Sequence, residues 1–97
     1  MNPGRRIYYH STWSENLDDI LTRGLVPGER TGDSFYEGRT VRRICLLDKP
    51  DTSGFYGDVI LKVIIPPGIR VKETVFSEGF YVTKPIPPRY ITVYRRL

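Results

Sequence analysis

The sequence predicts a small α+β domain, in which antiparallel strands build a split sheet or sandwich and a single helix lies near the N-terminus. Short runs of alternating apolar or aromatic residues dominate, which is typical of strands. Only the segment between residues 12 and 24 repeats apolar residues at helical spacing. Clusters of Pro and Gly separate the runs. A length of 97 residues fits one domain, residues 1–97.

The helix is expected directly after a first strand at residues 6–10. Thr12 and Glu15 have the spacing of a capping box, and Ser14 is a second N-cap candidate. Gly24 suits the helix end, where a left-handed residue is common. The residues expected to face the core are Trp13, Leu17, Ile20 and Leu21.

The rest of the chain is expected to be strands and loops. Residues 26–40 are rich in Gly and predict a long loop. Residues 58–65 are apolar on both faces, which predicts a central, buried strand. Cys45 lies between apolar residues and is expected to be buried, and Ile86 is expected to close the edge of the core. The other strands are expected at residues 41–47, 69–75, 79–83 and 90–94, with a turn at 48–57.

The composition excludes several classes of function. One Cys and one His do not suffice for a structural zinc site or a disulfide within the chain, so no metal is expected. No apolar run approaches the roughly 18 residues of a membrane span. The N-terminus also lacks the apolar core of a secretory signal. We therefore expect a cytoplasmic protein without membrane association.

The chain is basic, with 15 Lys and Arg against 11 Asp and Glu and a net charge of +4. Three Arg pairs stand out, at residues 5–6, 42–43 and 95–96. Arg pairs beside Tyr can line a phosphate-binding surface, whereas at strand ends they can simply face solvent. The basic surface is therefore compatible with a protein or a nucleic acid as partner, and it does not fix the oligomeric state.

One order of motifs is more specific than composition. It begins with YYHSTWSENLDDILTRGLVPG, continues with RRICLLDKPDTSGFYG and GDVILKVII, and ends with SEGFYVTKPIPPRYI. From Tyr8 to about Ile91, this order resembles the ADP-ribosyltransferase superfamily of diphtheria-toxin-like and poly(ADP-ribose) polymerase enzymes. The resemblance is to the small prokaryotic and phage members of that superfamily. It implies an ADP-ribosyltransferase-like fold and NAD as the substrate that supplies the ADP-ribosyl group.

The resemblance also implies roles for the residues of the first motif. His10 matches the first-strand His that hydrogen-bonds a ribose hydroxyl of NAD. Ser11 would offer its backbone groups to the nicotinamide amide, and Thr12 would brace the strand end. Considered without the resemblance, a lone His after a strand is more often a structural histidine that donates to a backbone carbonyl.

Later motifs supply the remaining site candidates. Phe55 or Tyr56 would stack on the nicotinamide, and Cys45 stands where the family usually has Tyr or Ser. Glu78 matches the final catalytic Glu, which would stabilise an oxocarbenium-like transition state. If that Glu belongs directly before the last aromatic strand, its position is Gly79 instead. Without the resemblance, Glu78 is an exposed charge, and the two aromatic residues are packing residues.

Three functional hypotheses follow. The first is an NAD-dependent mono-ADP-ribosyltransferase, a glycosyltransferase that modifies a protein or a nucleic acid, with His10 and Glu78 as catalytic residues. The second is an RNA 2′-phosphotransferase-like activity on the same fold, which would depend on the arginines at 5–6 and 42–43. The third is a non-catalytic binding or inhibitor module on this fold, of a kind that a phage could encode.

Overall fold

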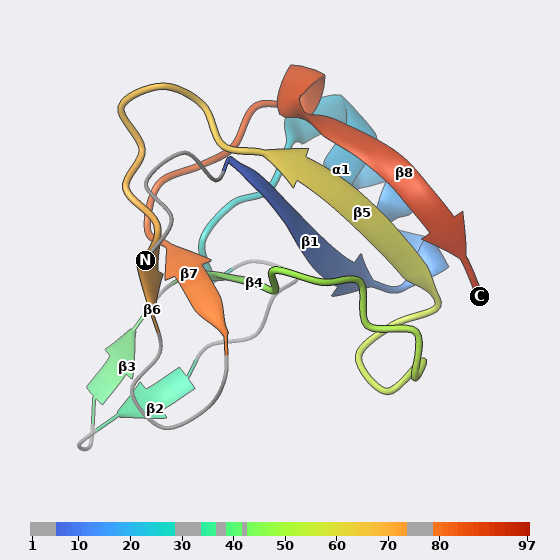
Figure 1. Ribbon diagram of the computed structural model, residues 1–97, viewed down its shortest axis with the longest axis horizontal. Helices are drawn as coiled ribbons and strands as arrows, with labels where there is room; N and C mark the ends of the chain where they lie inside the picture. Colours follow the sequence, from blue (N-terminus) through green and yellow to red (C-terminus); the bar gives the residue numbers. More distant parts are fainter. Residues whose placement is uncertain (1–5, 29–33, 37–38, 42, 74–78) are drawn as a thin grey trace.

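The computed structural model describes residues 6–28, 34–36, 39–41, 43–73 and 79–97. Within these ranges the chain forms one α-helix and antiparallel sheets (Figure 1), which confirms the predicted α+β class. The larger sheet has the order β1-β5-β8, with strands β1 (Ile7–Thr12), β5 (Val59–Ile64) and β8 (Ile91–Arg96). A second sheet has the order β4-β7-β6, with strands β4 (Ile44–Leu46), β7 (Phe80–Val82) and β6 (Lys72–Glu73). A separate hairpin pairs β2 (Ser34–Tyr36) with β3 (Arg39–Val41).

The two three-stranded sheets meet at β1. Tyr9 donates its amide to the carbonyl of Leu47 at 2.8 Å, and Leu47 returns a hydrogen bond to the Tyr9 carbonyl at 2.9 Å. This single bridge ties the segment after β4 to the edge of β1. The second sheet therefore joins the first sheet at Tyr9, one residue before His10.

The core lies on the face of the β1-β5-β8 sheet that carries Tyr8 and its cross-strand neighbour Val63. Side chains of β4 and β7 belong to the same apolar cluster, and so do two residues of α1 (Leu17–Arg23), which lies on one face of this sheet (Figure 1). β5 lies between β1 and β8, so the prediction of a central, buried strand is confirmed. The cluster consists of Tyr8, Leu17, Ile20, Leu25, Ile44, Leu46, Val59, Leu61, Val63, Ile65, Val82, Ile86 and Ile91.

The helix begins differently from the prediction. β1 runs on to Thr12, and a 3-10 turn, η1 (Ser14–Asn16), precedes α1. The capping box is therefore wrong, because Thr12 is a strand residue. A distant carboxylate takes its place: Asp58 accepts the Ser14 amide at 2.7 Å and the Ser14 hydroxyl at 3.1 Å.

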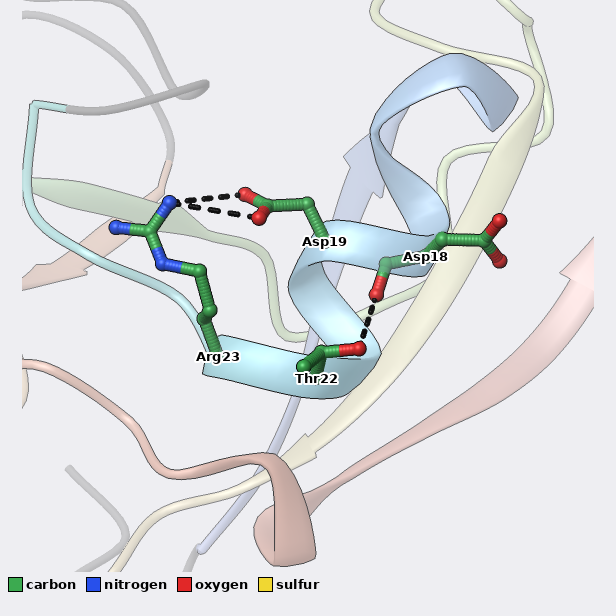
Figure 2. Close-up of polar contacts among 4 residues, drawn as sticks. All are labelled: Asp18, Asp19, Thr22 and Arg23. Carbon is green, nitrogen blue, oxygen red and sulfur yellow. Dashed lines mark hydrogen bonds and ion pairs between the residues drawn. The ribbon is translucent and has the colours of Figure 1, made fainter.

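The exposed side of α1 carries local polar contacts (Figure 2). Arg23 pairs with Asp19 at 3.3 Å, and Thr22 donates its hydroxyl to the carbonyl of Asp18 at 2.8 Å. Both contacts link residues one turn apart, which is the spacing at which helical side chains are neighbours.

The end of the helix agrees with the sequence. Gly24 has φ 87° and donates its amide to the Ile20 carbonyl. A Cβ at this position would lie 2.1 Å from the carbonyl oxygen of Ile86, so glycine is required for contact as well as for conformation. Leu25 and Ile86 then form an antiparallel bridge. Both are buried, which confirms that Ile86 closes the core.

Three residues expected in the core are exposed. Trp13 precedes the 3-10 turn rather than an α-helical turn, so the helical spacing that predicted its burial does not apply. Leu21 is exposed because the short helix buries only Leu17 and Ile20. Cys45 is exposed because β4 buries one face, that of Ile44 and Leu46, and leaves the other in solvent.

Strand boundaries also differ from the prediction. The expected loop at 26–40 contains β2, which pairs with β3 in a hairpin. Because Val41 is the last residue of β3, it belongs to the hairpin and not, as predicted, to the strand that holds Cys45. The expected strand at 69–75 is a strand only at β6, and residues 74 and 75 lie outside the described residues. A 3-10 turn, η2 (Pro88–Tyr90), leads into β8, which is longer than expected.

Candidate functional site

His10 lies in β1 beside the point where the second sheet joins the first. Its side chain is on the core face, as are those of Tyr8 and Thr12, because alternate residues of a strand point to the same side. The ring Nδ1 is 2.6 Å from the carbonyl oxygen of Cys45 in β4. A carbonyl only accepts hydrogen bonds, so Nδ1 carries the proton and Nε2 of the neutral ring presents a lone pair.

Two buried polar atoms on this face have no hydrogen-bond partner among the described residues. They are Nε2 of His10 and Oγ1 of Thr12. An unsatisfied buried polar group costs about 1–3 kcal/mol, and native proteins normally pair such groups with protein, water or ligand. Nε2 can only accept a hydrogen bond in this tautomer, whereas the Thr12 hydroxyl can donate or accept. Nε2 therefore suits a donor such as the hydroxyl of a ligand or a water molecule.

The electrostatics of the site keep His10 neutral. Burial of the ring lowers the pKa of His10 below its usual value, and the hydrogen bond to Cys45 opposes this shift only in part. At neutral pH the imidazole is thus an uncharged acceptor rather than an imidazolium donor.

The turn at 48–57 carries an exposed aromatic pair. Phe55 and Tyr56 are 81% and 70% exposed, and their rings stack with centroids 5.7 Å apart and planes 29° apart. Within the turn, Ser53 donates its amide to Asp51 at 2.9 Å, and the Ser53 hydroxyl accepts the amide of Phe55 at 3.1 Å. The exposure shows that neither ring is the packing residue that a purely structural interpretation expected.

Gly57 fixes this turn against the end of β1. A Cβ at Gly57 would lie 2.1 Å from the carbonyl oxygen of Thr12 and 2.6 Å from its amide nitrogen. The backbone of the turn therefore passes directly over the last residue of β1. Because Tyr56 precedes Gly57, the turn that carries the aromatic pair is joined through its backbone to Thr12, two residues after His10 in β1.

The remaining predicted site residues are placed less closely. Ser11 is opposite Ile60 in β5, and its side chain is on the face of β1 that His10 does not share. Glu78 lies outside the described residues, so its catalytic role stays a prediction. β7 begins shortly afterwards, with Phe80 opposite Leu46, so the start of β7 lies against the strand that contacts His10.

The arginines of the phosphotransferase hypothesis are partly described. Arg6 donates to the carbonyl of Ile65, and the guanidinium of Arg43 lies 4.9 Å from the ring centre of Tyr81. Arg5 and Arg42 lie outside the described residues. Both described arginines are engaged by protein groups, and this hypothesis stays a prediction.

Sequence reasoning missed two parts of the site. The Cys45 carbonyl is a backbone group, and no side-chain pattern indicates which carbonyl a distant histidine will reach. The contact of Gly57 with Thr12 had a signal, since a glycine stands two residues before the central strand β5. In strands and their ends, such a glycine often marks a close approach of another backbone.

Comparison with models of protein families found no match, and comparison with curated proteins or with solved structures found none either. In the part of the chain that the structure describes, no three His, Cys, Asp or Glu side chains gather closely enough to hold a metal ion. The helix found in those residues is too short to cross a membrane.

Proposed function

We propose that this chain is a minimal NAD-dependent mono-ADP-ribosyltransferase, with His10 as a ribose-binding residue. In that reaction the bond between the nicotinamide nitrogen and the ribose breaks, and nicotinamide leaves with the electron pair. A nucleophile of the acceptor, a protein or a nucleic acid, loses a proton and forms the new bond to the ribose carbon. NAD is the substrate, and the proposed site holds no other cofactor.

The observation that carries the proposal is the state of His10. A buried neutral imidazole whose Nδ1 is tied to Cys45 offers Nε2 as an acceptor with no protein partner among the described residues. A ribose hydroxyl is a donor that matches this acceptor. The family resemblance assigns that hydroxyl to the same histidine.

Two further features support the proposal. The stacked, exposed pair Phe55 and Tyr56 offers aromatic surface to a planar ring such as nicotinamide. The contact between Gly57 and Thr12 joins the turn that carries this pair to the last residue of β1, two residues after His10. Glu78 would supply the fixed negative charge where positive charge develops on the ribose.

His10→Asn is the sharpest variant for testing the site. The asparagine amide can still donate to the Cys45 carbonyl, as Nδ1 does, but the chain then has no acceptor at the place of Nε2. We expect NAD to bind about three- to tenfold more weakly, the effect of one lost hydrogen bond. Isothermal titration or a thermal shift would measure it, because a ligand at about 100 times its Kd stabilises by about 2.7 kcal/mol.

Catalysis is tested separately by the release of nicotinamide from NAD. We expect release by the unmodified chain and its loss in both His10→Asn and Glu78→Gln. Trp13→Leu, a change at an exposed residue outside the site, serves as the control and should retain the activity. Undiminished release in both site variants would contradict the proposal. NAD binding without any release would instead support the non-catalytic binding module.

A further inference from the structure

The β1-β5-β8 sheet has a second face, opposite the one that carries His10 and the core. Cross-strand pairs define it: Ile7 is opposite Ile64, and Lys62 has Tyr9 on one side and Thr92 on the other. Both isoleucines are exposed, and Tyr9 and Lys62 are half-buried. We call this the tyrosine face, and its residues are Ile7, Tyr9, Ser11, Ile60, Lys62, Ile64, Thr92, Tyr94 and Arg95. Ile60 is fully buried beneath its neighbours on this face.

An irregularity in β8 brings Tyr94 and Arg95 to this face together. Leu61 is opposite Val93, but the next residue of β5, Ile60, is opposite Arg95, so Tyr94 is an extra residue at a β-bulge. In a regular strand, neighbouring side chains point to opposite faces. Here Arg95 shares the face of Ile60, and Tyr94 contacts Tyr9 on the same face.

The two tyrosines form an ordered aromatic unit. Their ring centres are 5.1 Å apart and the planes meet at 71°, an edge-to-face contact that fixes the orientation of Tyr94. Tyr94 is nevertheless 50% exposed, so part of its ring is open to solvent. A fixed, open ring surface is what a nucleobase needs for stacking.

The charge of the sheet has one sign. None of its three strands contains an Asp or Glu, whereas Lys62, Arg95 and Arg96 are cationic. On the tyrosine face Arg95 is exposed and Lys62 lies beside Tyr9, whereas Arg96 is opposite Val59 and belongs to the other face. This arrangement is complementary to a phosphate backbone, since the aromatic rings and the cations lie next to one another on an open sheet.

We propose that the tyrosine face binds single-stranded nucleic acid. A base stacks on Tyr94, and neighbouring phosphates contact Lys62 and Arg95. Duplex nucleic acid does not fit in the same way, because its bases are already stacked and only its phosphates remain accessible. The surface is opposite the face of His10, so the proposal does not depend on NAD binding or on transferase activity.

The test is fluorescence anisotropy with labelled oligothymidine and oligouridine of about 12 nucleotides, a length that such sites span. We expect Kd values of roughly 1–100 µM near physiological salt. Tyr94→Leu keeps the apolar contact with Tyr9 but removes the stacking ring, and it should weaken binding about tenfold. Tyr94→Phe keeps the ring and should bind within about twofold of the unmodified chain.

A charge variant and a control complete the design. Arg95→Gln should lower the slope of log affinity against log salt by about 0.7, the effect of one lost phosphate contact on a single strand. Trp13→Leu removes an aromatic ring of similar exposure, 47%, from a different place and should bind normally. Thermal melts of all variants verify folding, and the stronger of the DNA and RNA arms identifies the preferred nucleic acid.

Three outcomes would overturn the proposal. The first is no binding of either oligonucleotide at low salt. The second is equal binding by Tyr94→Leu and Tyr94→Phe in folded protein. The third is self-association of the chain through this face, detected by sedimentation and abolished by Tyr94→Leu, with no nucleic acid bound.

Discussion

At the scale of single residues, the chemistry of the chain depends on close contacts between backbone and side chain. His10 is an acceptor at Nε2 only because its Nδ1 donates to the Cys45 carbonyl 2.6 Å away. This hydrogen bond goes to the backbone carbonyl of Cys45, and the exposed thiol of the same residue takes no part in it. The role of His10 therefore depends on a backbone atom of Cys45 and not on the type of side chain at that position.

His10 should make stability depend on pH in a defined direction. The pKa of His10 is lowered in the folded state by burial, so the unfolded chain binds the proton more tightly. The stabilising contribution is complete above the unfolded pKa of about 6.5 and is lost as the pH falls toward the lower folded pKa. The unfolding free energy of the unmodified chain should therefore fall relative to that of His10→Asn between about pH 7 and pH 5. Urea unfolding at several pH values measures this, and parallel curves would contradict it.

Gly57→Ala should be strongly destabilising. Its Cβ would meet three backbone atoms of Thr12 at 2.1–2.6 Å, and backbone cannot move aside as a flexible side chain can. We expect a loss of about 2–3 kcal/mol in the free energy of unfolding, measured by chemical denaturation. Gly68→Ala is the matched control, since φ is 86° but nothing lies within 4 Å of the added Cβ. It should cost only about 1 kcal/mol, for the left-handed backbone alone.

At the scale of elements, each boundary is decided by partners from other parts of the chain. β1 extends to Thr12 because β5 continues opposite it, with Thr12 paired to Val59. The following 3-10 turn is held by Asp58, which directly precedes β5. The strand and the turn after it are thus both positioned by the same neighbouring segment.

Asp58→Ala should lower the free energy of unfolding by more than the partial exposure of the Asp58 side chain suggests. The carboxylate accepts two hydrogen bonds from Ser14 and substitutes for a local helix cap, so we expect a loss of about 1–2 kcal/mol. Asp19→Ala is the control: it removes an exposed ion pair with Arg23 (Figure 2) and should change stability by less than about 0.5 kcal/mol. Equal losses in the two variants, measured by thermal unfolding, would contradict the capping role.

At the scale of the whole molecule, two faces of one small sheet have separate environments. One face packs on α1 and the second sheet, and it carries the core together with His10. The other carries the exposed side chains of Ile7, Ile64 and Tyr94, and its three strands contain no Asp or Glu. A sheet with one buried face leaves the other available for contact with a partner.

The core of so small a molecule should respond sharply to truncation. Ile86 is fully buried and bridges to Leu25, and Ile86→Ala should cost about 2–5 kcal/mol. Ile64→Ala changes the same residue type on the open face, where the side chain is 42% exposed, and should cost less than about 1 kcal/mol. Chemical denaturation of both variants measures the difference, and similar losses would place Ile86 outside the core.

The α+β class, the central strand at β5 and the end of the helix at Gly24 could be predicted from the residue pattern alone, because they follow from periodicity and local backbone preference. The sequence also indicated His10 as the residue of interest. Four features became apparent only in the folded chain: the tautomer of His10, the distant cap at Asp58, the exposure of Trp13 and Cys45, and the bulge that places Tyr94 and Arg95 on one face. The physical reason is that these features depend on backbone groups and strand register contributed from far along the chain. Neither a distant backbone group nor the strand register leaves a signal in the local sequence around the residue whose environment it determines.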